Sequence, residues 1–416
     1  MIAALSSSPS VTYHFCRRPI MENFGANLIR ATDSNNSEDF VSPDVVVAVV
    51  DCNGVRWTKS SGDVDVDSVM FFASQGKLFT VVAAMQAVER GLIGLDDDVA
   101  EHLPELAALP VLDSQDENGE WKTSLRKAKI SLRHLLTHTS GAGYDMPSPE
   151  LREWKAQTGL KSSMLDGDFK IFESLPLLFE PGTGWAYGGG VDWAGELVAR
   201  LNHTKLESYL QMNVCQPLGL TSTTFHPENL RDWPQRRHQC YLRMGSSSSV
   251  EKIPIEANTN PTRDCGGHGI FSTPTDFMKL LVALLNDGGA ILSKQSVEEI
   301  LRPQGVPGQF AETILGDLKP LFAPSLLAGS RMDHGLGGMV NLADIPQVRK
   351  AGTIQWSGAP NMIWWLDRTS GIAAASFMQL FPPGDARAGM FNIEFESAVY
   401  RELNQVQIES LEDWSY

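Results

Sequence analysis

Several features that define other protein classes are scarce or missing in this 416-residue chain. No apolar run approaches the roughly 18 residues that a membrane-spanning helix needs. The five cysteines are odd in number, scattered, and without Cys-x-x-Cys spacing. They therefore indicate free thiols and argue against a disulfide framework or a zinc site.

The chain also has fewer basic than acidic residues. The chain has 34 lysines and arginines against 50 acidic residues, which gives a net charge of −16. This balance argues against nucleic acid or an anionic membrane as a partner. The N-terminus has no basic region followed by an apolar core of signal-peptide length, so we expect a cytoplasmic location.

Three familiar catalytic signatures are absent. The sequence contains no Gly-x-x-x-x-Gly-Lys-Ser/Thr phosphate loop, no Gly-x-Gly-x-x-Gly dinucleotide turn and no Gly-x-Ser-x-Gly elbow. The nine histidines are dispersed, and the pair His134 and His138 has no evident third ligand, so we expect it to be structural. We therefore expect no cofactor and no metal.

The length and the patterning predict an α+β fold with two lobes. Residues 1–42 read as a flexible leader and a first helix. Residues 43–95 and 261–416 together predict an antiparallel sheet flanked by helices, because strand-like and helix-like patterns mix there. Residues 96–260 show helical patterns between polar loops and no strong strand, so we expect a mostly helical lobe. The active site is expected between the two lobes.

The most informative stretch is Ser74-Gln75-Gly76-Lys77, which opens an apolar run that ends near Gly91. Apolar residues recur at positions 78, 81, 82, 85 and 88, which predicts an amphipathic helix. Residues three apart share a helix face, so Ser74 and Lys77 should lie side by side. A serine becomes a nucleophile when a neighbour takes its proton, and a desolvated lysine can do so.

The four-residue pattern alone is weak evidence, because Ser-x-x-Lys also occurs at Ser124–Lys127 and Ser249–Lys252. Ser124 lies in a basic polar stretch and Ser249 ends a serine run. Only Ser74 follows a strand-like segment and begins a buried helix. A capping serine beside a snorkelling lysine is the plainer alternative for Ser74 itself.

Two further stretches carry candidate groups. The glycine-rich loop 181–190 presents Tyr187, which could pass protons between Ser74 and a leaving oxygen. The stretch 352–361 predicts a strand whose end is small and backbone-exposed, suited to donating an N–H to an oxyanion. Taken alone, Tyr187 is explained more simply as an aromatic plug packed on a loop, and the second stretch is weak evidence.

Together these stretches resemble the class C β-lactamase-like serine hydrolases, over roughly residues 40 to 403. The resemblance implies a β-lactamase/transpeptidase-like fold. Further landmarks occur in the same order along the chain: His134-Leu135-Leu136-Thr137-His138-Thr139-Ser140-Gly141, Glu180-Pro181-Gly182, Gly266-Gly267-His268-Gly269 and His334-Gly335-Leu336-Gly337.

Within that family the chain looks most like the fungal lovastatin-type acyltransferases and the family VIII esterases. The stretches that carry this likeness are 185–195, 265–269 and 358–361. The resemblance implies that Ser74 is the acylated nucleophile, Lys77 its base and Tyr187 the second proton carrier. It also implies that the backbone N–H groups of Ser74 and Ala359 form the oxyanion hole.

Two departures from the wider family bear on the substrate. Where β-lactamases and D-Ala-D-Ala peptidases have Tyr-x-Asn and Lys-Thr-Gly, this chain has Tyr187-Gly188-Gly189 and Trp356-Ser357-Gly358. Burying a substrate carboxylate without its cation is costly, so an uncharged ligand is favoured. The substrate-binding residues that we expect are Tyr144, Trp185, Trp356, Ser357 and Gly358.

These observations predict a serine acyltransferase of secondary metabolism. It would move an acyl group from a thioester, through acyl-Ser74, to an alcohol of a polyketide- or terpenoid-like acceptor. The alternative is a carboxylesterase that gives the acyl group to water; a β-lactamase, a D-Ala-D-Ala peptidase and a non-catalytic scaffold are less favoured.

The expected partners are a small-molecule acceptor and, as donor, an acyl carrier protein or a coenzyme A thioester. A basic stretch could dock an acidic carrier protein, although a solvated helix face explains it more simply. Its residues are Lys122, Arg126, Lys127, Lys129 and Arg133.

Overall fold

The computed structural model describes residues 19–254 and 257–412, so the first 18 residues of the expected leader lie outside it. Its centre is a seven-stranded sheet in the order β2-β1-β13-β12-β11-β10-β9, with antiparallel neighbours throughout. The strands are β1 (Val45–Asp51), β2 (Gly54–Ser61), β9 (Met332–His334), β10 (Met339–Asn341), β11 (Ile354–Gly358), β12 (Met362–Asp367) and β13 (Ile372–Phe377).

Early and late parts of the chain meet in this sheet. A hairpin at Asn53-Gly54 joins β1 to β2, and β1 pairs along its other edge with β13. Because successive side chains of a strand point to opposite faces, Val45, Val47 and Val49 pack on one side of the sheet. Val46, Ala48 and Val50 pack on the other. The predicted antiparallel sheet with flanking helices is confirmed.

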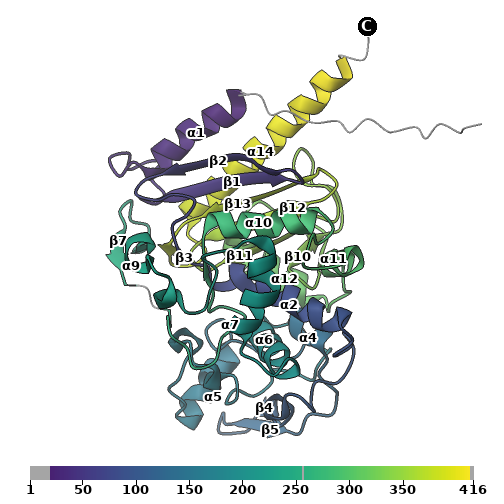
Figure 1. Ribbon diagram of the computed structural model, residues 1–416. Coiled ribbons are helices and arrows are strands. Elements are labelled where there is room, and N and C mark those ends of the chain that lie inside the picture. The colour runs from purple at the N-terminus through teal and green to yellow at the C-terminus, as the bar shows by residue number, and fades with distance from the viewer. Residues whose placement is uncertain (1–18, 255–256, 413–416) are drawn as a thin grey trace, which may run out of the picture.

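Helices cover both faces of the sheet (Figure 1). On one face, α1 (Pro19–Thr32) and α14 (Ala386–Glu412) pack together with the odd-numbered valines of β1. On the other face lie α10 (Pro274–Leu285) and, deeper, α2 (Lys77–Glu89), with α11 (Lys294–Leu301) beside α2. Among the described residues, no helix combines the length and apolarity needed to cross a membrane.

Residues 96–254 form mostly short helices, and Figure 1 shows most of them on the side away from α1 and α14. The longer helices there are α5 (Pro149–Thr158) and α6 (Gly190–Leu201), and the shorter ones include α3 (Pro104–Ala107), α4 (Leu132–Leu136) and α7 (Leu206–Leu210).

Short strands accompany the helices of this lobe. It holds β4 (Val111–Gln115) paired with β5 (Trp121–Ser124), and β6 (Cys240–Leu242) paired with β7 (Glu251–Ile253). β6 also pairs with β14 (Leu380–Phe381), which follows the main sheet. β5 and β7 are three or four residues long with no buried position, so they carry no alternation of apolar and polar residues that sequence reasoning could detect.

The helix after Ser74 differs from the expected amphipathic helix. Every residue of α2 from Lys77 to Ala87 is buried, because the helix runs between the sheet and the helical lobe. Its polar side chains therefore need partners inside the protein: the Thr80 hydroxyl donates to the Gly266 carbonyl over 2.7 Å. The predicted stop is confirmed, since Gly91 has a left-handed φ of 67°.

Two histidines are buried together beneath the sheet edge. The rings of His138 and His334 lie 5.5 Å apart, and both pack against Trp356. Burial lowers the pKa of His334 to about 4, although a bond to the Gly335 carbonyl partly opposes the shift. Burial, followed by the charges of His334 and Lys77, also lowers the pKa of His138 well below its usual value.

This burial predicts a loss of stability in mild acid. In the unfolded chain a histidine titrates near 6.5, so between pH 6.5 and 4 the unfolded state binds more protons than the folded state. For His334 the free energy of unfolding should fall by about 1.4 kcal/mol per pH unit as the pH drops through that window. The variant His334→Phe keeps a ring but takes no proton. Urea unfolding at pH 7 and pH 5 should show a smaller loss for the variant, and equal losses would contradict the prediction.

Candidate active site

Ser74 lies on a tight turn between a strand and a helix. The strand β3 (Met70–Phe71) pairs with β8 (Phe271–Ser272), and the chain then enters the 3₁₀ turn η1 (Ala73–Gly76), which runs directly into α2. Ala73 has a left-handed φ of 47°, a conformation that costs an alanine on the order of 1 kcal/mol and is often found at functional sites. Residues i and i+3 eclipse in a 3₁₀ turn, so Ser74 faces Lys77.

The structure brings the three expected catalytic side chains together. Lys77 Nζ lies 3.1 Å from Ser74 Oγ, and the Tyr187 hydroxyl donates a hydrogen bond to the same Oγ. Nζ also lies 4.8 Å from the centre of the Tyr187 ring. Ser74 and Lys77 come from the turn and helix after β3, whereas Tyr187 comes from the loop before α6, so the site lies where these two parts of the chain meet.

Lys77 has two further partners that the sequence did not indicate. Its Nζ donates to the Tyr144 hydroxyl over 3.2 Å and to the Gly267 carbonyl over 2.5 Å. Tyr144 in turn donates to Asp192 Oδ2 over 2.6 Å. Asp192 Oδ1 accepts the Gly267 N–H and lies 3.0 Å from His268 Nδ1. Asp192, Gly267 and His268 fall in the stretches that carry the family resemblance, which was the available signal for them.

Two groups in this network have shifted pKa values. Burial raises the pKa of Tyr144 well above its usual range, and the neighbouring Asp192 raises it further. Burial alone would raise the pKa of Asp192, but the charge and hydrogen bond of His268, with contributions from Lys77 and Tyr144, outweigh it and lower the pKa. Tyr144 therefore keeps its proton and Asp192 is the acceptor.

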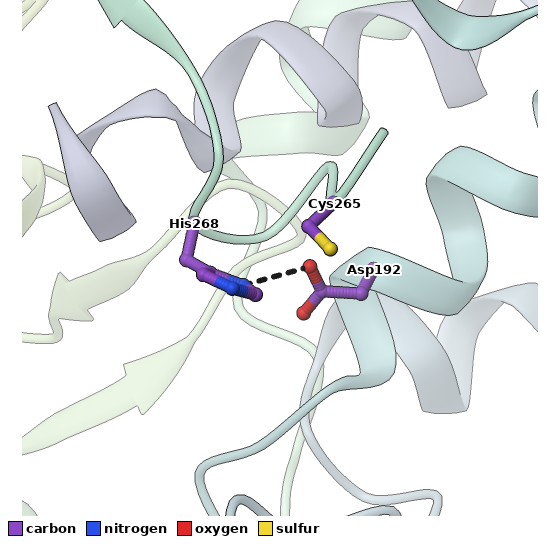
Figure 2. A group of neighbouring side chains, drawn as sticks. All are labelled: Asp192, Cys265 and His268. Atoms are coloured by element: carbon purple, nitrogen blue, oxygen red, sulfur yellow. Dashed lines mark hydrogen bonds and ion pairs between the residues drawn. The ribbon is translucent and has the colours of Figure 1, made fainter. Parts of the chain in front are cut away.

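Asp192 and His268 also form a compact group with Cys265, and Figure 2 shows the three side chains pointing toward one another. Their ligand atoms lie within 4.8 Å of one another, which suits a metal in outline. However, Asp192 is already bonded to Gly267, Tyr144 and His268. Burial, then the charge of Asp192, raises the pKa of the Cys265 thiol well above its usual value, so it stays protonated. The group fits a hydrogen-bonded network better than a metal site.

A cavity of about 340 Å³ opens beside Ser74. This volume lies within the usual range of small-molecule sites. Ser74, Asn258 and His268 are its main polar side chains, and Ala359, one of the two expected oxyanion donors, also lines it. Apolar side chains form most of the wall, among them Phe71, Met146, Met164, Leu242, Ile253 and Phe381.

The aromatic residues that we expected to bind substrate, Tyr144, Trp185 and Trp356, lie elsewhere around the site. Trp356 is buried against Phe322, with ring centres 4.5 Å apart, and stacks on His138. Trp185 stacks on Tyr187 at 6.5 Å, and Trp356 contacts the same tyrosine at 5.6 Å. Both tryptophans therefore support the ring of Tyr187, while Tyr144 lies beneath Lys77. None of the three is among the residues that line the cavity at Ser74, so their contact with substrate stays a prediction.

The segment of residues 303–330 explains the position of Trp356. It folds into α12 (Gln309–Leu315) and α13 (Lys319–Phe322), and the last residue of α13 covers the indole ring. Sequence reasoning did not detect this cover, because it depends on a contact between segments more than 30 residues apart.

The end of β11 packs tightly on the nucleophile turn. A Cβ added to Gly358 would lie 2.6 Å from the Phe72 carbonyl, so only glycine fits there. The Ser357 hydroxyl is buried and has no hydrogen-bond partner within residues 19–254 and 257–412. At Gly189, where the wider family has asparagine, an added Cβ would lie 2.7 Å from the Phe172 ring. Substrate binding by Ser357 and Gly358 stays a prediction.

The other sequence candidates have ordinary structural surroundings. Ser124 donates to Asp113 over 2.9 Å on strand β5, and Ser249 is exposed beside Ser247. His134 caps α4 through a reciprocal bond with Ser131. In the basic stretch, Lys129 and Arg133 already bind Asp96, and Arg133 also binds Glu299.

Comparison with known proteins agrees with this geometry. The β-lactamase family model matches residues 34–396. Monacolin J acid methylbutanoyltransferase of Aspergillus terreus is 34% identical, over 87% of this chain and 92% of its own length. Lovastatin esterase of Penicillium rubens is 31% identical, over 82% of this chain and 86% of its own.

A solved structure of unliganded simvastatin synthase from Aspergillus terreus superposes with a TM-score of 0.85 at 32% identity, covering 93% of this chain and 99% of the other. These matches confirm the resemblance to fungal lovastatin-type enzymes and the β-lactamase/transpeptidase-like fold. The chain therefore belongs to the β-lactamase family and is an enzyme of its acyltransferase and esterase branch.

Proposed function

We propose that this protein is a serine acyltransferase that moves an acyl group from a thioester donor, through an ester on Ser74, to an alcohol of an apolar polyketide- or terpenoid-like acceptor. The observation that carries the proposal is the contact of Ser74 Oγ with both Lys77 and Tyr187 at the edge of an apolar cavity. Relatives named as methylbutanoyltransferases and acyltransferases support it.

In the first half-reaction, Ser74 Oγ attacks the thioester carbonyl while its proton passes to Lys77 Nζ. The carbonyl oxygen becomes an oxyanion, for which the backbone N–H groups of Ser74 and Ala359 are the proposed donors. Collapse of this intermediate breaks the carbon–sulfur bond. The sulfur leaves with a proton delivered from Lys77 by way of Tyr187, and the acyl group stays on Ser74.

In the second half-reaction, the acceptor hydroxyl attacks the ester carbonyl and gives its proton to Tyr187, which at the same time passes its own proton to the neutral Lys77 amine. The bond to Ser74 Oγ then breaks, Oγ regains a proton from Tyr187 or Lys77, and the new ester leaves. The apolar cavity wall favours this outcome over hydrolysis, because it binds an apolar acceptor and excludes water.

The donor is proposed to be a thioester of coenzyme A or of an acyl carrier protein. The exposed Lys122 and Lys127 provide positive charge in an otherwise acidic chain, which suits an acidic carrier or a phosphorylated cofactor arm. A cytoplasmic location is part of the same proposal, since both donors are found there.

Replacing Ser74 by alanine should abolish turnover, because the acyl group then has no oxygen to bind. In the parent enzyme, a fluorophosphonate probe followed by peptide mass analysis should place the adduct on Ser74. Ser124→Ala and Ser249→Ala are the matched controls and should label like the parent. An adduct on either of those serines would contradict the assignment.

Lys77→Met and Tyr187→Phe should each keep the fold and slow acylation by about 10²- to 10⁴-fold, the usual effect of losing a general base. The measurement is single-turnover release of p-nitrophenol from an activated ester, with circular dichroism to check folding. Near-normal acylation in a folded Lys77→Met enzyme would show that another group is the base.

The acyl-enzyme should partition toward an apolar alcohol in preference to water. An acceptor that buries about 200 Å² of apolar surface gains several kcal/mol at about 25 cal/mol per Å². The test acylates the enzyme with a model thioester and adds a series of polycyclic alcohols, and mass spectrometry then compares ester with free acid. If free acid dominates at saturating acceptor while a matching ester is hydrolysed rapidly, the protein is an esterase, as the relative from Penicillium rubens is named.

A further inference from the structure

We propose that Asp192 is a positioning residue for the reaction: acting through Tyr144, it fixes the direction of the Lys77 amine so that its lone pair faces Ser74. The inference rests on the proposed function only in taking Ser74 as the acylated residue, and it holds for transfer and for hydrolysis alike. The observation behind it is the set of hydrogen bonds around the buried Nζ of Lys77.

The first step is the direction of the Tyr144 bond. A tyrosine hydroxyl has a single proton, and an ionised carboxylate only accepts. Tyr144 lies 2.6 Å from Asp192 Oδ2, so its proton is committed to Asp192. The oxygen of Tyr144 therefore presents a lone pair to Lys77 Nζ, 3.2 Å away. Tyr144 is 1% exposed and Asp192 is 0% exposed, so water does not compete for these bonds.

The second step concerns the Lys77 amine. The Gly267 carbonyl accepts one Nζ proton and Tyr144 accepts a second. Lys77 can act as a base only in its neutral form, in which the amine has two protons and one lone pair. With both protons fixed by these acceptors, the lone pair is left for the third neighbour, Ser74 Oγ, at 3.1 Å. That is the arrangement in which Lys77 removes the serine proton.

The third step is what holds Asp192. Its Oδ1 accepts the Gly267 N–H over 2.8 Å and lies 3.0 Å from Nδ1 of His268, whose side chain is 10% exposed. Gly267 thus serves the network twice, because its N–H fixes Asp192 and its carbonyl fixes Lys77. His268 lines the cavity at Ser74, so the network extends from the cavity wall to the nucleophile.

A purely structural role makes a different prediction, and the chain contains a matched control for it. His238, Asp44 and Tyr241 form a second buried histidine–aspartate–tyrosine group, in which Tyr241 donates to Asp44 over 2.7 Å and His238 lies 3.7 Å from Asp44. The described contacts of this group include none with Ser74, Lys77 or Tyr187. Removing the Tyr241 hydroxyl should therefore affect stability without affecting acylation.

The decisive variant is Asp192→Asn. An asparagine oxygen can still accept from Gly267 and His268, but its NH₂ group then faces Tyr144 and donates to it. Tyr144 must turn its own proton toward Lys77, where it occupies the lone pair that Ser74 needs. Tyr144→Phe removes that competing proton together with one of the two acceptors. Adding Tyr144→Phe to Asp192→Asn should therefore partly restore the rate.

The experiment measures the single-turnover burst of p-nitrophenol from an activated ester in the full-length enzyme, with urea unfolding of each variant. We expect acylation to fall about 100-fold in Asp192→Asn and about tenfold in Tyr144→Phe, in line with the cost of a misplaced catalytic group. The double variant should match Tyr144→Phe and so be about tenfold faster than Asp192→Asn. Tyr241→Phe should acylate within about twofold of the parent.

Two results would overturn the proposal. One is a folded Asp192→Asn enzyme that acylates at the parent rate; the other is a double variant as slow as Asp192→Asn or slower. If Asp192→Asn does not fold, Tyr144→Phe alone decides, because parent-like acylation would show that Tyr144 does not direct the amine. Absence of any burst in the parent would instead contradict Ser74 acylation itself, so the two failures are distinguishable.

Discussion

The site depends on the burial of one amine. Lys77 is 4% exposed and lies in a helix that is covered on every side, so its nitrogen can bind only groups that the protein supplies. Leaving such a group without partners would cost several kcal/mol. The three oxygens around it, from Ser74, Tyr144 and Gly267, are therefore a structural requirement, and in the proposed mechanism they also direct the amine toward Ser74.

The fold can be understood as the means of burying that helix. The antiparallel sheet and α10 cover one side of α2, and α6 with its neighbours covers the other (Figure 1). This packing brings the loop that carries Tyr187 against Ser74. The tight turn at Ala73 and the close approach of Gly358 bring the end of β11 next to Ser74. Tertiary packing and catalytic geometry are thus set by the same contacts.

The cavity explains how closely related enzymes could form the same kind of acyl-enzyme and still differ in whether an alcohol or water attacks it. In the proposed mechanism, Ser74, Lys77 and Tyr187 supply the same proton transfers whether an alcohol or water attacks. The choice between them rests on the apolar walls, formed by side chains from several separate parts of the chain, including Phe71, Met164, Leu242 and Phe381. A family that contains both named transferases and a named esterase is consistent with a shared centre and variable walls.

The sequence by itself determined the sheet-forming segments, the catalytic candidates and the family, because these depend on local patterns: an apolar period, a Ser-x-x-Lys spacing, a glycine-rich loop. It did not reveal the buried network of Asp192, Tyr144 and His268, the cover of Phe322 over Trp356, or the true cavity walls. Each of those depends on contacts between residues far apart in the chain. Such contacts produce no periodic pattern in the sequence. Only the tertiary structure decides which group accepts the proton of the buried Tyr144 hydroxyl, because packing brings the Asp192 carboxylate within hydrogen-bond distance.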